Sequence, residues 1–137
     1  MSDVTPALRA AVIRRAEQRC EYCGLSQVGQ EAAFHIDHVV PRAAAGTTAE
    51  NNLALACVSC SLHKAAKQAA VDPDDGAIVP LFNPRSQQWA GHFRWQGETV
   101  VGTTPSGRAT VTALKLNRPL ILAIRREEAS RGRHPHL

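Results

Sequence analysis

The sequence is poor in aromatic residues and has no long apolar run. Aromatic residues make up 4% of its 137 residues, and no segment approaches the roughly 18 apolar residues that a membrane span needs. The N-terminus also lacks the basic and then hydrophobic order of a signal peptide. We therefore expect a soluble cytoplasmic protein with no membrane partner. The length predicts about one domain, and 44% apolar and 20% charged residues are typical of a globular chain.

Acidic residues are scarce in the second half of the chain. Beyond residue 75 there are three, Glu98, Glu127 and Glu128, against nine basic residues, so residues 76–137 carry a charge of +6. Residues 1–75 carry −2, and 13 of the 16 basic residues are arginine. This asymmetry favours a polyanionic partner, because arginine makes bidentate contacts with phosphate. The alternative is a basic but merely solvated surface.

Apolar periodicity and turn signals predict an α+β fold. We expect helices over residues 6–19, 60–68, 105–116 and 119–132, with proline near the start of three of them. Strands are predicted over residues 32–40, 53–57 and 78–82, and a hairpin over residues 93–101 with Gly97 in its turn. The dense turn signal at residues 72–76 separates residues 1–75 from a basic extension, 76–137. We expect the two parts to pack as one domain.

The four cysteines occur in two identical pairs, Cys20-x2-Cys23 and Cys57-x2-Cys60, with 33 residues between the pairs. Two such knuckles supply the four soft ligands of a tetrahedral, structural Zn²⁺. Two disulfides are the first alternative, which a reducing compartment disfavours. A redox-active pair is the second alternative, and it leaves the other pair unexplained.

The segment between and after the knuckles reads His35-Ile36-Asp37-His38, then Asn52-Leu53, then Cys60-Ser61-Leu62-His63-Lys64. Over residues 20–68 this pattern resembles the HNH endonuclease family. The ββα-metal motif of that family has an Asp-His dipeptide, an Asn before a Leu, and a His or Asn after the last zinc cysteine. Residues 81–85, 89–97 and 104–110 also look like the C-terminal extension of small stand-alone HNH proteins. The resemblance implies a zinc-stapled ββα-metal core that carries an N-terminal helix, with a β-hairpin and two helices after it.

The residues of this pattern suit phosphodiester hydrolysis. His38 can act as a general base for water, because an imidazole of ordinary pKa is mostly neutral near pH 7. Asp37 offers the hard oxygen that Mg²⁺ or Mn²⁺ prefers, and it points to the opposite face of a strand from His38. A structural carboxylate paired with Arg42 is the alternative for Asp37. The resemblance gives Asn52 the role of holding the histidine ring.

One position departs from the family. Ser61 follows the last zinc cysteine, where the family has His or Asn as the second ligand of the catalytic metal. His63 is the rival ligand, but in a helix it lies about 200° around from Ser61, so both cannot face Asp37. Of the two, we prefer Ser61.

These observations predict a metal-dependent HNH nuclease that nicks or cleaves DNA, and the resemblance makes duplex DNA the expected substrate. The alternative is a zinc-stapled nucleic-acid binding module with a decayed catalytic centre. A thiol oxidoreductase would not explain Asp37, His38 and Asn52. The sequence does not determine the oligomeric state. The expected nucleic-acid contacts are His35, Arg42, Lys64, Arg85, Arg94 and Arg108.

Overall fold

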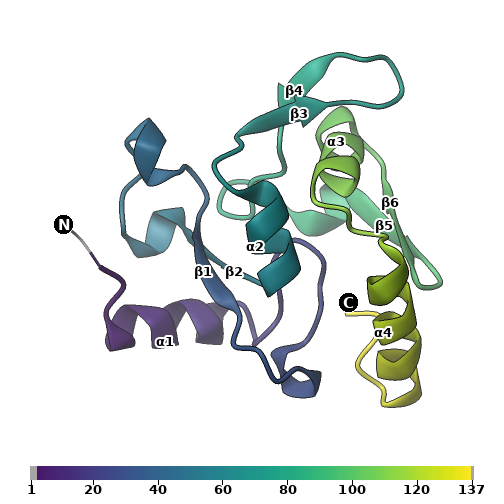
Figure 1. Ribbon diagram of the computed structural model, residues 1–137, viewed down its shortest axis with the longest axis horizontal. Helices are drawn as coiled ribbons and strands as arrows, with labels where there is room; N and C mark the ends of the chain where they lie inside the picture. The colour runs from purple at the N-terminus through teal and green to yellow at the C-terminus, as the bar shows by residue number, and fades with distance from the viewer. Residues whose placement is uncertain (1–2, 137) are drawn as a thin grey trace.

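The computed structural model describes residues 3–136, which form four α-helices and three two-stranded antiparallel sheets joined by loops and short 3-10 turns (Figure 1). The helices are α1 (Pro6–Arg15), α2 (Val58–Lys64), α3 (Pro105–Ala113) and α4 (Pro119–Ser130). The strands are β1 (His35–His38), β2 (Leu53–Ala56), β3 (Ala69–Val71), β4 (Ile78–Pro80), β5 (Phe93–Gln96) and β6 (Thr99–Gly102). The predicted α+β class is confirmed.

The first half of the chain forms a strand pair covered by helices. β1 and β2 pair antiparallel, with Asp37 opposite Ala54 and His38 opposite Leu53. All four residues of β2 are buried, because α1 packs against β2 and α2 packs against both strands. Alternate residues of β1 therefore face different surroundings, and this alternation sets the directions of the predicted site residues.

The second half adds two hairpins and two helices. β3 pairs with β4, β5 pairs with β6, and α3 packs against β3, β4 and β6. Thr104 caps α3 by accepting a hydrogen bond from the amide of Gly107 at 3.0 Å, as its Thr-Pro start predicts. Gly107 lies so close to the neighbouring backbone that a Cβ there would be 2.1 Å from the carbonyl oxygen of His92.

Several element boundaries differ from the sequence predictions. α1 ends at Arg15 rather than residue 19, because Glu17 and Gln18 adopt positive φ angles of 54° and 60°. α2 begins before Cys60, since the Cys57 side chain accepts a hydrogen bond from the amide of Cys60 and caps the helix. β3 is absent from the sequence prediction, because its three residues, Ala-Ala-Val, are too few to show an alternation of polar and apolar side chains.

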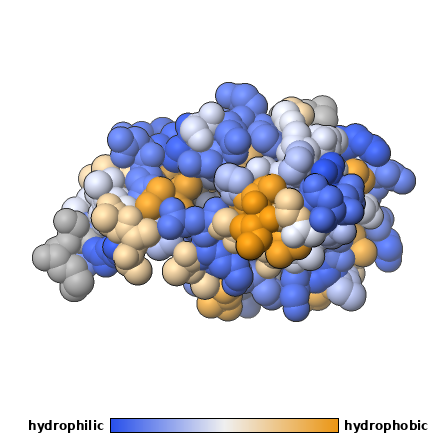
Figure 2. Space-filling model, turned by 90° about the horizontal axis from the view of Figure 1, so that it is seen from above, coloured by the Kyte–Doolittle hydropathy of each residue, from blue (hydrophilic) through white to orange (hydrophobic). Residues whose placement is uncertain are grey.

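Buried residues from both halves join one hydrophobic cluster, which includes Val12, Leu55, Phe82, Leu116 and Ile121. The division at residue 75, and its packing as one domain, stays a prediction. The face shown in Figure 2 is mainly hydrophilic, with a few apolar patches. Among the exposed apolar side chains of the described residues are Val71 and Ile78, which pair across β3 and β4. None of the helices within residues 3–136 has the length and apolar character to span a membrane.

Candidate metal centre and nuclease site

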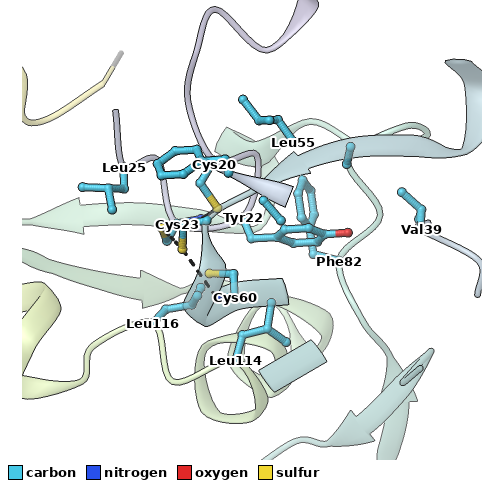
Figure 3. Close-up of a cluster of buried hydrophobic side chains, with 14 of the residues drawn as sticks. Cys20, Tyr22, Cys23, Leu25, Val39, Leu55, Cys60, Phe82, Leu114 and Leu116 are labelled. Carbon is cyan, nitrogen blue, oxygen red and sulfur yellow. Dashed lines mark hydrogen bonds between the residues drawn. The ribbon is translucent and has the colours of Figure 1, made fainter. Parts of the chain in front are cut away.

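The four cysteine side chains converge on one buried point. Their sulfur atoms all lie within 4.8 Å of one another, and the Sγ atoms of Cys23 and Cys57 are 3.7 Å apart. One pair comes from the turn after α1 and the other from the start of α2. Leu114 and Leu116, which follow α3 in the basic extension, lie close to the cysteine cluster (Figure 3).

The chemistry of this cluster fits a divalent metal ion. None of the four cysteines forms a disulfide. Without a metal the thiols cannot all ionise: hydrogen bonds from the other three lower the pKa of Cys57, whereas burial raises the pKa of Cys20. A bound cation takes the place of the thiol protons, so that all four sulfur atoms can be thiolates. Four sulfur ligands at this spacing suit tetrahedral Zn²⁺. The predicted disulfide alternative is wrong, and the cluster is a candidate zinc site.

Asp37 lies on the face of β1 that α2 covers. Its Oδ2 accepts a hydrogen bond of 2.8 Å from the hydroxyl of Tyr22, and the ammonium of Lys64 is 3.2 Å from the same oxygen. The remaining oxygen, Oδ1, has a long contact of 3.5 Å with Lys64. Burial raises the pKa of Asp37, and the charge of Lys64 opposes that rise. Sequence reasoning missed Tyr22, which it treated as part of a cysteine knuckle.

Lys64 is not a nucleic-acid contact. Its side chain is 2% exposed, and its ammonium also donates to the carbonyl oxygens of His38 and Val39, at 3.0 and 3.1 Å. The prediction that Lys64 contacts phosphate is therefore wrong. The alternative partner proposed for Asp37, Arg42, is exposed, and Lys64 forms the ion pair instead.

His38 points to the other face of β1 and is half-buried. Its Nε2 lies 2.9 Å from the hydroxyl of Thr48, in the loop between β1 and β2. Burial lowers the pKa of His38, and the nearby charge of Arg42 lowers it further. The imidazole is therefore neutral near pH 7, as a general base must be.

Asn52 holds the backbone of that loop rather than the histidine ring. Its Oδ1 accepts from the amide of Val40 at 2.9 Å, and its Nδ2 donates to the carbonyl oxygens of Val40 and Thr47 at 3.0 and 2.9 Å. The expected direct contact with His38 is thus wrong. Asn52 instead binds the loop next to Thr48, the residue that contacts the imidazole and that sequence reasoning did not identify.

Ser61 faces β1 and His63 does not. The Ser61 hydroxyl lies 2.9 Å from Nδ1 of His35, which shares a strand face with Asp37. Nδ1 of His63 instead donates to the carbonyl oxygen of Ser59, 2.8 Å away on the same helix. The geometry agrees with the argument that the two side chains of α2 face different ways.

Two of the predicted DNA-binding arginines have acidic partners. Arg85 pairs with Glu21, and Arg108 pairs with Asp72 at 2.8 Å and Asp74 at 3.0 Å. The shortage of acids beyond residue 75 does not leave these two arginines unpaired, because their partners lie within residues 1–75. Arg94 is exposed and, within the described residues, its side chain forms no hydrogen bond or ion pair.

Comparison with known proteins agrees with this geometry. Residues 20–67 match the family model described as HNH endonuclease. This confirms the resemblance found in the sequence, over the segment that holds the cysteine cluster and the β1–β2–α2 unit. The match ends before β3, so it leaves the rest of the chain unassigned. No curated protein and no solved structure matches the chain.

Proposed function

We propose that this protein is a metal-dependent endonuclease that nicks or cleaves duplex DNA in the cytoplasm. The observation that carries the proposal is the half-buried His38, whose pKa is lowered and whose ring is held by Thr48, inside a segment that matches an HNH endonuclease model. The family match supports a nuclease-type function in general. The substrate, the metal and the residue roles are our proposal.

In the proposed reaction, Nδ1 of His38, the ring nitrogen that Thr48 does not contact, accepts the proton of the attacking water. Thr48 orients the ring, and Asn52 keeps the loop that carries Thr48 in place. A bound Mg²⁺ or Mn²⁺ would supply charge stabilisation at the phosphate and the leaving oxygen. Oδ1 of Asp37, the less engaged of its two oxygens, would hold such a cation, and Ser61 with His35 would be the second donor group on that face.

Plasmid nicking tests the proposal. We expect zinc-loaded protein to convert supercoiled plasmid to open circles with Mg²⁺ or Mn²⁺, and His38→Ala to lower the rate by 100-fold or more, a loss on the order of general-base catalysis. The matched control is His63→Ala, because that ring bonds to its own helix and should leave most activity intact.

The second candidate function is a zinc-stapled nucleic-acid binding module. The buried Lys64–Asp37 pair favours it, because Lys64 already neutralises the carboxylate that a catalytic cation needs. This candidate predicts salt-sensitive DNA binding that survives His38→Ala, with no nicking at any metal concentration. That result would contradict the nuclease.

A further inference from the structure

One buried cation has no acidic partner among the described residues. Arg125, on α4, is 2% exposed. Its Nη1 donates to the carbonyl oxygen of Glu98 at 2.9 Å and to Oδ1 of Asn117 at 3.1 Å, and its guanidinium carbon lies 5.0 Å from the centre of the Trp95 ring. Its Nη2 is buried and has no hydrogen-bond partner within residues 3–136. Leaving a buried charged donor without a partner destabilises the folded protein.

The cysteine cluster is the negative group that this donor can meet. Arg125 and Cys23 line the same small cavity, together with Leu25 and Ser26. Burial lowers the pKa of Arg125, and negative charge on Cys23, Cys60 and Cys20 acts in the opposite direction.

The neighbouring carboxylate is already neutralised. Glu128 lines that cavity as well, but Arg133 binds it at 2.6 Å. The cysteine thiolates are therefore the negative groups near Arg125 that no other cation neutralises. Four thiolates outweigh the charge of one Zn²⁺ by two, and a buried dianion is costly without a nearby cation.

We infer that Arg125 is a positioning residue of the zinc centre: from the cavity that it shares with Cys23, its guanidinium offsets the excess charge of the thiolates, and its unpartnered Nη2 is the donor available to them when the metal is bound. Trp95, Glu98 and Asn117 hold the guanidinium in place. Helix α4 lies outside the HNH match, so the extension contributes to the metal centre beside the first knuckle. This inference does not depend on the proposed nuclease activity.

The test compares metal binding in three full-length variants. We expect Arg125→Met to lower the apparent zinc affinity by about 10- to 100-fold, the range for lost partners of metal ligands, measured by competition with a chromogenic chelator. In the cobalt-substituted protein, the sulfur-to-cobalt charge-transfer band should move to longer wavelength, because the thiolates become better electron donors. Arg126→Met is the matched control: this neighbour is 72% exposed and pairs with Glu98, so neither readout should change.

Arg125→Lys provides the conservative variant. It keeps the charge but not the second N–H group, so it should restore part of the affinity and shift the band less, in the same direction. If Arg125→Met does not fold, the band of Arg125→Lys decides, and an unchanged band overturns the inference. A purely structural Arg125 would lower the melting temperature without moving the cobalt band, and that result would also overturn it.

Discussion

At the scale of single residues, Asp37 and Lys64 form a buried ion pair at the candidate site. The two side chains are 8% and 2% exposed, and the ammonium also binds two carbonyl oxygens at the end of β1. A lysine in a basic chain is usually a surface group, yet here it holds the strand that presents Asp37 and His38. Removing one member of a buried ion pair leaves the other charge uncompensated.

We therefore expect Lys64→Met to lower the free energy of unfolding of the zinc-loaded protein by about 3–5 kcal/mol. Urea denaturation measures the change. Lys67→Met is the control, because Lys67 is exposed and donates to one carbonyl oxygen, that of His63; its effect should stay within about 0.5 kcal/mol. Equal effects of the two substitutions would show that Lys64 is not a structural cation.

At the second-ligand position, Ser61→Ala should abolish metal-dependent cleavage, whereas His63→Ala should keep most of it. The reason is that Ser61 faces β1 and His35, and His63 bonds to Ser59. Ser61→Asn should hold or raise activity, because an amide oxygen is the ligand that the family usually has there. Plasmid nicking rates measure all three. An inactive His63→Ala beside an active Ser61→Ala would transfer the role to His63.

At the scale of elements, α3 is positioned by close backbone contact rather than by side chains. Gly107 lies in the helix, and Gly102 at the end of β6 is equally confined: a Cβ there would lie 2.4 Å from the amide nitrogen of Arg108. Because the backbones of α3 and β6 come so close, α3 packs directly on β6. The Thr110 hydroxyl then accepts a hydrogen bond from the amide of Phe82 at 2.9 Å.

Gly107→Ala should consequently destabilise the protein by about 2 kcal/mol, a typical cost of overpacking. The sign of the change in the free energy of unfolding distinguishes the two cases, since Gly→Ala within an exposed helix stabilises by up to about 1 kcal/mol. Thermal and urea unfolding measure it. Gly91→Ala, where a Cβ meets nothing within 4 Å, should change the stability little. A neutral Gly107→Ala would mean that α3 can move away from His92.

For the whole molecule, the cysteine cluster lies among buried residues that come from both halves of the chain. The knuckles come from residues 20–23 and 57–60, and residues of the extension such as Leu114 and Leu116 share their buried cluster. A metal that binds the folded state alone would therefore contribute a large part of the stability of so small a chain.

We expect one tightly bound Zn²⁺ per chain, and unfolding on chelation or in Cys57→Ala, because the zinc contributes on the order of 10 kcal/mol. Elemental analysis and circular dichroism measure the two effects. Protein that contains no zinc, folds with intact structure and forms disulfides between the pairs would contradict this.

The basic surface should also act at the scale of the molecule. Arg94→Ala should weaken DNA binding and lower the salt slope by about one unit, because an unpaired exposed arginine is free to release a counterion from phosphate. Arg85→Ala and Arg108→Ala should instead lower the melting temperature, since both pair with acids of the first half. Fluorescence anisotropy over a range of salt measures the slopes. Equal slopes for Arg94→Ala and the parent protein would exclude a phosphate contact there.

The sequence by itself determined the features that depend on local spacing. Two CxxC pairs define the metal ligands, Asp37-His38 on a strand places two groups on opposite faces, and Ser61 and His63 diverge on a helix. The Thr-Pro pairs also marked the true starts of α1 and α3. Such features follow from the covalent geometry and periodicity of a few consecutive residues.

The tertiary structure alone decided which charges are paired and buried. Lys64 meets Asp37 across 27 positions, Arg108 meets Asp72 across 36, and Asn52 turns its amide to the backbone of its loop. Arg125 reaches the cysteine cluster from the far end of the chain. These outcomes depend on which segments pack together, and no local pattern of charge or hydropathy encodes a partner that lies tens of residues away.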